Sequence, residues 1–338
     1  MLKRSAAVAA FALLGCSAHL GSAAYADGML SDFQYPHAVE RYAFTSQGQA
    51  LEMAYMDIAP TGAGNGKTVV LFHGKNFCGA TWEGVIGPLA KAGYRVIVPD
   101  QIGFCKSTKP ETYQMSFHQL AANTHALLTS RGIVNPILVG HSMGGMVATR
   151  YALSFPEDTS ALALVNPIGL EDWSAKGVPS RTVDELLATE RKTDAARIKA
   201  YQQKTYYDGR WRPEFDRWVD MLASTYRGEG ADLAALSQAR ASDMIFTQPV
   251  VHEFPRLKMP VVLLIGDRDT TAIGKDRAPP ELAAKLGHYP DLAREAAKRI
   301  SNAKLISFPD LGHAPQIERP DDFNAALLNA LAQLPAAR

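Results

Sequence analysis

The chain has 338 residues, of which 47% are hydrophobic and 20% are charged, a balance typical of an ordinary globular protein. This composition excludes a disordered, collagen-like or coiled-coil chain. Lys and Arg total 35 against 34 Asp and Glu, which gives a formal net charge of +1. Because binding to a phosphate backbone needs a basic surface, we expect no nucleic acid partner.

The N-terminus has the pattern of an export signal. Two basic residues precede an apolar run at 6–14, and a small-x-small cleavage pattern ends at Ala26. The run is too short to span a bilayer. The sequence therefore predicts a signal peptide over residues 1–26 and a periplasmic or secreted mature protein without a transmembrane segment. The alternatives are a lipoprotein anchored through Cys16 and an N-terminal helix that is never cleaved.

Cys78 and Cys105 are the cysteines that remain after cleavage. Exported proteins mature where disulfides form, and a bridge here would close a loop of about 27 residues, worth about 3.5 kcal/mol. The spacing fits two separate buried thiols equally well. The nine His are scattered and no zinc-type spacing occurs, so we expect no metal site.

Two alternating segments, 39–44 and 51–58, predict an antiparallel strand pair. Short apolar runs then alternate with helix-like segments along the chain. The predicted strands are 69–72, 94–98, 136–139, 161–165, 261–265 and 304–308, and the predicted helices are 81–92, 116–131, 143–155 and 320–334. This alternation indicates a mostly parallel sheet with helices on both faces. The glycine-rich stretch 62–66 precedes a strand and opens no helix, so it is a turn and not a dinucleotide-binding loop.

The alternation breaks between residues 169 and 256. Charged residues, aromatic residues and helix formers replace the short apolar runs there. Because the alternation resumes afterwards, we interpret 169–256 as a helical cap inserted into one α/β domain. The two parts of that domain span 27–168 and 257–338.

A Gly-x-Ser-x-Gly motif occupies 140–144, with Ser142 as its serine. It follows the predicted strand 136–139 and precedes the predicted helix 143–155, which is the strand-turn-helix context of a nucleophile elbow. The glycines fit a turn so sharp that a Cβ would collide with neighbouring elements. Ser142 is the predicted nucleophile. The alternative is a glycine-rich helix start with a capping serine.

A serine hydroxyl needs a base, and the base needs an acid to fix its tautomer. On this scaffold the expected chain order is serine, acid, histidine. The loop after strand 261–265 carries Asp267 and Asp269, and the loop after strand 304–308 carries His313. Both loops follow the carboxyl ends of strands, where sites form in parallel sheets.

These residues resemble the α/β-hydrolase family, and the resemblance covers almost all of the chain after the signal, including a cap. The resemblance implies an α/β-hydrolase fold. Its Gly-x-x-Asp pattern favours Asp269 over Asp267 as the acid, and its late Gly-His matches His313 as the base. For the acid, alternatives after the preceding strand are Glu171 and Asp172. For the base, the alternative is His288.

The resemblance also implies an oxyanion hole made of backbone N–H groups. One comes from Met143, the residue after the nucleophile. The other comes from the His-Gly-x loop at 73–79, where Lys75 is the expected donor and Asn76 the second choice. The Lys75 side chain need not take part, because the donor is a backbone group.

A second loop, 100–107, resembles the family's Asp-x-x-Gly-x-Gly-x-Ser, with Cys105 in place of the second glycine. In the family this loop approaches the oxyanion loop, which carries Cys78 here. The resemblance therefore favours a Cys78–Cys105 disulfide, which would restrain the oxyanion loop.

The resulting hypothesis is an exported serine hydrolase that cleaves a carboxylic ester or related small acyl compound without a cofactor. The alternatives are a carbon–carbon bond hydrolase of ring-fission products with the same triad, and a binding protein without turnover. The cap contributes aromatic residues that either cover the mouth of the site or pack the cap's own core. They are Tyr206, Tyr207, Trp211, Phe215 and Trp218.

Overall fold

The structure is a computed structural model that describes residues 28–334. The predicted signal peptide at 1–26 and Cys16 lie outside these residues. None of the helices within 28–334 is long and apolar enough to cross a membrane.

Eight strands form one sheet in the order β1-β2-β4-β3-β5-β6-β7-β8. The strands are β1 (Glu40–Ser46), β2 (Gln49–Ile58), β3 (Thr68–Phe72), β4 (Arg95–Pro99), β5 (Ile137–His141), β6 (Ala161–Val165), β7 (Val261–Gly266) and β8 (Ala303–Phe308). The pairs β1–β2 and β2–β4 are antiparallel, and the other pairs are parallel. The predicted antiparallel pair and the predicted parallel strands are confirmed.

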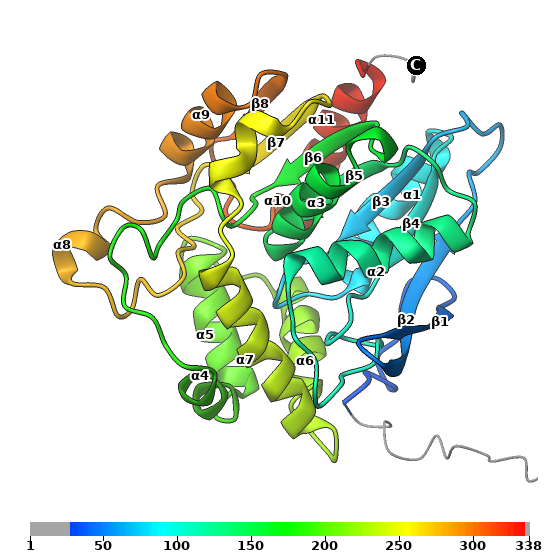
Figure 1. Ribbon diagram of the computed structural model, residues 1–338. Helices are drawn as coiled ribbons and strands as arrows, with labels where there is room; N and C mark the ends of the chain where they lie inside the picture. The colour runs from blue at the N-terminus through cyan, green and yellow to red at the C-terminus, as the bar shows by residue number, and fades with distance from the viewer. Residues whose placement is uncertain (1–27, 335–338) are drawn as a thin grey trace, which may run out of the picture.

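Helices lie on both faces of the sheet and in the insertion (Figure 1). The α-helices are α1 (Glu83–Lys91), α2 (Phe117–Ser130), α3 (Met143–Ser154), α4 (Val183–Glu190), α5 (Ala195–Thr205), α6 (Asp216–Ser224), α7 (Ala231–Thr247), α8 (Pro280–Ala283), α9 (Tyr289–Arg299), α10 (Pro315–Glu318) and α11 (Pro320–Ala332). Short 3-10 helices are η2 (Gly79–Trp82), η3 (Pro156–Asp158), η4 (Pro213–Phe215) and η5 (Val251–Arg256).

Two apolar clusters sandwich the sheet. In β3, Val70 and Phe72 pack in the cluster that contains residues of α2, α3 and α9. The alternate residues Val69 and Leu71 pack in the cluster that contains residues of α1 and α11. Successive strand side chains point to opposite faces, and here both faces are buried, so the central strands read as continuous apolar runs.

The cap helices α4 to α7 leave the sheet after β6 and return to it at β7. Because β6 and β7 are neighbours and parallel, the insertion does not interrupt the sheet. Figure 1 shows α4 to α7 gathered together below the carboxyl ends of the parallel strands β3 and β6 in that view. The fold is the expected mostly parallel sheet with flanking helices and an extra helical insertion.

Candidate active site

Ser142 lies between the last residue of β5 and the first residue of α3, with φ 55° and ψ −122°. A positive φ is strained for a residue with a side chain. The flanking glycines make the turn sterically feasible. A Cβ on Gly140 would lie 2.4 Å from the Gly144 oxygen, and one on Gly144 would lie 2.3 Å from the oxygen of Phe72. The glycines of the motif are therefore required by backbone packing.

His313 and Asp269 form a fully buried pair, with Nδ1 of the histidine 2.6 Å from Oδ2 of the aspartate. Because a carboxylate accepts, Nδ1 carries the proton and Nε2 of the neutral ring keeps its lone pair. Within residues 28–334, Nε2 has no hydrogen-bond partner, so no hydrogen bond joins it to the hydroxyl of Ser142. Such bonds are commonly long without substrate and tighten in the complex.

Two further groups fix the carboxylate of Asp269. Asn166 Nδ2 donates to Oδ2 at 3.0 Å, and the backbone N–H of Thr271 donates to Oδ1 at 2.8 Å. Asn166 is itself held, because its Oδ1 accepts the N–H of Gly266 at 2.8 Å. Asn166 was not predicted from the sequence. The available signal was a polar residue directly after a fully buried strand.

One nearby residue and two distant segments hold the backbone around His313. The N–H of Gly312 donates to Glu318 Oε1 at 2.6 Å, and the N–H of His313 donates to the Tyr206 carbonyl at 2.8 Å. Nε2 of His141 donates to the His313 carbonyl at 2.8 Å. The histidine is therefore fixed by the C-terminal region, the cap and the nucleophile elbow together.

Burial shifts the pKa of several groups around this loop. It lowers the pKa of His141 well below its ordinary value, which agrees with a neutral ring that donates from Nε2. It likewise lowers the pKa of His73, whose Nδ1 donates to the Gly74 carbonyl at 2.8 Å. Burial raises the pKa of Glu318 to about 7. Neither His73 nor His141 therefore adds a positive charge beside the Asp269–His313 pair.

The predicted oxyanion loop lies against Ser142. A Cβ on Gly74 would be 2.9 Å from the Ser142 Cβ and 3.3 Å from its Oγ. The Lys75 side chain turns to the cap, where Nζ pairs with Glu190 of α4 at 2.8 Å. Met143 is the first residue of α3, so its N–H has no partner inside the helix. The loop and the helix start thus flank the same serine.

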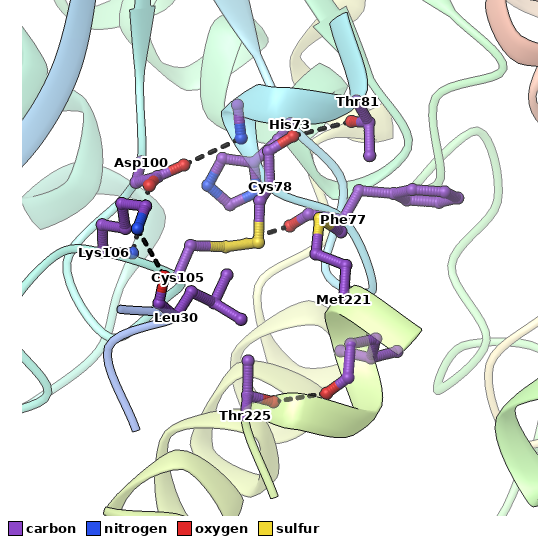
Figure 2. Close-up of a disulfide and its surroundings, with 12 residues drawn as sticks. Leu30, His73, Phe77, Cys78, Thr81, Asp100, Cys105, Lys106, Met221 and Thr225 are labelled. Atoms are coloured by element: carbon purple, nitrogen blue, oxygen red, sulfur yellow. Dashed lines mark hydrogen bonds between the residues drawn. A yellow bond between two sulfur atoms is a disulfide. The ribbon is translucent and has the colours of Figure 1, made fainter. Parts of the chain in front are cut away.

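A disulfide joins Cys78 to Cys105, with their Cα atoms 5.7 Å apart. This is the pairing that the resemblance favoured. Figure 2 shows the bridge with Asp100 on the sheet side and, on the cap side, Met221 of α6 and Thr225, the residue that follows this helix. The bridge ties the oxyanion loop to the loop that follows β4. Cys105 has a φ of 51°, in the region that favours the glycine it replaces.

The alternatives for acid and base lie apart from the His313 ring. Asp172 pairs with a histidine of η5 at 2.7 Å, and Glu171 contacts a tryptophan and a lysine. Asp267 is half-buried and makes no hydrogen bond to the ring. His288 is exposed and bonds through Nε2 to a backbone carbonyl four residues earlier.

Most of the cap aromatics pack internally. Tyr207 stacks on Phe215 with ring centroids 4.1 Å apart, and Trp218 belongs to the large core. Tyr206 differs, because its ring stacks on the imidazole of His313 with centroids 4.4 Å apart and an interplanar angle of 24°. Sequence analysis gave no reason to single out Tyr206 within this group.

Among the described residues, the ligand atoms of His73, Asp100 and Cys105 lie within 4.8 Å of one another. The sulfur of Cys105 is bonded in the disulfide. Nε2 of His73 accepts the N–H of Gln101 at 3.0 Å, and Asp100 Oδ1 accepts the N–H of Gly79 at 2.8 Å. These donor atoms are therefore already used within the protein, and the cluster does not fit a metal.

Comparison with known proteins agrees with the fold. A solved structure of a "probable hydrolytic enzyme" from Pseudomonas aeruginosa PAO1 is 58% identical, with a TM-score of 0.89 over 90% of this chain and 97% of that one. Lipase 1 of Psychrobacter immobilis is 27% identical over 68% of this chain and 66% of the lipase. A 2-hydroxy-6-oxononadienedioate/2-hydroxy-6-oxononatrienedioate hydrolase of Comamonas testosteroni is 39% identical over 37% of this chain and 44% of that enzyme. The model of the alpha/beta hydrolase fold matches residues 67–320, and the chain therefore belongs to the α/β-hydrolase fold family.

Proposed function

We propose that this hydrolase is an exported serine hydrolase that cleaves a carboxylic ester or a related acyl compound. One observation carries the proposal: the buried Asp269–His313 pair leaves Nε2 unpartnered, in a site whose neighbouring elbow presents Ser142. A base with a fixed tautomer beside a strained serine is the arrangement that nucleophilic acyl transfer requires.

In the proposed reaction, Ser142 Oγ attacks the substrate carbonyl carbon while Nε2 of His313 takes the hydroxyl proton. The C–O bond to the leaving group then breaks, and His313 returns that proton to the departing alkoxide. Water attacks the acyl-enzyme with the same proton transfers and releases the carboxylic acid. Asp269 orients His313 and stabilises the imidazolium in both steps.

The oxyanion that forms in each step needs donors aimed at its position. We assign these to the backbone N–H groups of Met143 and Lys75. The close approach of Gly74 to Ser142 and the position of Met143 at the helix start support this assignment. The positive end of α3 adds to the stabilisation of negative charge there.

A panel of aryl esters from acetate to long acyl chains, assayed with the mature protein and with Ser142→Ala, tests the proposal. We expect the variant to lose several orders of magnitude in rate, because the triad acts as a unit. Ser301→Ala, at an exposed serine, is the matched control. Equal rates in wild type and Ser142→Ala would rule out this nucleophile.

A carbon–carbon bond hydrolase is the second candidate. The local identity to the Comamonas testosteroni enzyme, 39% over 127 residues, favours it. Ring-fission products belong in the same substrate panel. Cleavage of such a product with a higher kcat/KM than any ester would make this the function, and a serine-directed phosphonate probe that leaves Ser142 unlabelled would instead favour a binding protein.

Export is part of the proposal and has its own test. The disulfide supports it, because such bridges persist outside the reducing cytosol. We expect protein recovered from the periplasm or medium to begin at Asp27. A mature N-terminus that retains residues 1–26 would contradict cleavage, and a lipid-modified Cys16 would show anchoring instead.

A further inference from the structure

Tyr206, the residue that follows α5 in the cap, contacts the candidate active site in three ways. Its carbonyl accepts the N–H of His313 at 2.8 Å. Its ring stacks on the imidazole with centroids 4.4 Å apart. Its hydroxyl accepts Nδ2 of Asn76, in the oxyanion loop, at 2.9 Å. One cap residue therefore touches both the candidate base and the loop assigned to the oxyanion.

The contact between Tyr206 and the histidine loop depends on a glycine. A Cβ on Gly312 would lie 1.9 Å from the Tyr206 oxygen, a distance that no larger residue could accept. The adjoining cap chain is bonded to the same region, because Arg210 donates to the Asp310 carbonyl at 2.7 Å and Arg212 donates to the Glu318 carbonyl at 2.6 Å. The cap segment 206–212 therefore makes hydrogen bonds to several residues between 310 and 318.

The stacked ring has a chemical consequence for a base. In the proposed reaction the imidazole of His313 becomes an imidazolium in each step. The face of an aromatic ring attracts a cation, and the attraction is larger where water is excluded. His313 is fully buried, and the Tyr206 ring is nearly parallel to it at 24°. The ring therefore favours the charged form of the histidine over the neutral form.

We propose that Tyr206 is a positioning residue for His313: its carbonyl fixes the backbone of the base, its ring stabilises the imidazolium, and its hydroxyl links the base to the oxyanion loop. The inference rests on the proposed serine hydrolase activity. It makes the cap a component of the catalytic centre and not only a cover for it.

Three variants separate this role from packing. Tyr206→Leu removes the ring, whereas Tyr206→Phe keeps the ring and loses the hydroxyl's bonds with Asn76 and Tyr201. Tyr207→Leu is the matched control, because Tyr207 is buried beside Tyr206 and stacks on Phe215. The backbone bond to His313 remains in all three.

Kinetics with an aryl ester across pH give the first readout. For Tyr206→Leu we expect kcat to fall about 3- to 30-fold, the range that a cation–aromatic contact provides. We also expect the acidic limb of the kcat/KM profile to move to lower pH by about half a unit or more, because the imidazolium is less stabilised. Tyr206→Phe should keep the position of that limb.

NMR titration of the His313 ring gives a second readout that needs no turnover. The titration midpoint should move to lower pH in Tyr206→Leu and stay in place in Tyr207→Leu. If both leucine variants lower the rate equally and neither moves the midpoint, Tyr206 only packs the cap and the proposal is wrong. If wild type cleaves no ester yet the midpoint moves as expected, the ester assignment fails while the role of Tyr206 stands.

Discussion

The nucleophile elbow and the histidine loop achieve the same precision by different means. The elbow is encoded by one short motif, and Gly140 and Gly144 allow its strained turn to pack closely on itself and on β3. The histidine loop donates hydrogen bonds to Glu318 and to the Tyr206 carbonyl and accepts one from His141, and these partners belong to α10, the cap and β5. The first region is therefore recognisable from a single motif, and the second is held by contacts that no single motif contains.

This contrast separates the kinds of damage that substitutions should cause. Substitutions of the elbow glycines act through steric overlap, so they should lower the stability of the protein. Changes at the histidine loop act through hydrogen bonds and charge, so they should leave the fold intact and alter activity or its pH dependence. The following variants test that division.

Asp269→Asn should have the largest effect. An amide keeps the shape of the side chain but cannot hold the Nδ1–H tautomer of His313, so we expect kcat to fall about 10⁴-fold. The far-UV circular dichroism spectrum should match wild type. Asp267→Asn, two residues earlier, is the control and should keep most of the activity. Equal losses in the two variants would mean that Asp269 is not the acid.

Gly144→Ala tests the elbow. The new Cβ would meet backbone, 2.3 Å from the oxygen of Phe72, so we expect the free energy of unfolding to fall by about 4 kcal/mol, beyond the usual cost of overpacking. Gly87→Ala in α1 is the control, because a Cβ there meets nothing within 4 Å. It should stabilise the helix by about 0.5–1 kcal/mol. Urea unfolding measures both, and similar stabilities would refute steric control of the turn.

The disulfide joins the oxyanion loop, which lies against the elbow, to the loop that follows β4. Replacing both cysteines with alanine should lower the free energy of unfolding by about 3.5 kcal/mol, from the entropy of the 27-residue loop. Pairing Cys78→Ala with Cys105→Gly should recover about 1 kcal/mol of this, because glycine tolerates the positive φ at that position. Chemical unfolding with and without reductant measures the difference. An alanine pair as stable as wild type would show that the bridge adds nothing.

Glu318→Gln should have the smallest effect, one that depends on pH. Burial raises the pKa of Glu318 from 4.5 to about 7, so between these values the folded protein holds a proton that the unfolded chain has released. Wild type therefore loses about 3 kcal/mol of stability as pH rises from 4.5 to 7, and the loss is complete above 7. The stability of Glu318→Gln should not fall in this way, because glutamine does not titrate.

The groups that face Glu318 are Arg210 and Arg212 of the cap, Asp269 and Tyr207. These groups are present in both wild type and Glu318→Gln, so the comparison of the two proteins isolates the carboxyl of Glu318. Thermal unfolding at pH 5 and pH 8 should show Glu318→Gln gaining on wild type at the higher pH. A difference that stays constant between the two pH values would contradict titration of this carboxyl.

The sequence predicted those parts of the structure that are encoded in short segments. The strand predicted at 161–165 is β6, and the one predicted at 136–139 continues through His141 because it pairs with the end of β6. The helix predicted from residue 81 begins at Glu83, after a 3-10 turn. The assignments of Ser142 and His313 came from local motifs in the same way, and their roles stay predictions until the variants are measured.

The supporting contacts were beyond sequence reasoning. Asn166 and Asp269 are 103 residues apart and meet because their strands, β6 and β7, are neighbours. Tyr206 meets His313 only because the cap returns to the sheet. No periodicity or motif encodes such a meeting, since each partner alone is an ordinary residue of its element. The structure therefore shows what the sequence could not predict, namely the contacts between residues that are far apart in the chain.

The attachment of segment 206–212 to the histidine loop bears on attempts to build chimeras. Replacing the whole insertion with a foreign cap would remove the Tyr206 carbonyl, which accepts the N–H of His313. It would also remove the backbone that packs against Gly312. A chimera that keeps residues 206–212 of this protein would keep the hydrogen bond between Tyr206 and His313. The cap helices α4 to α7 would then form the exchangeable module with which substrate preference could be redesigned.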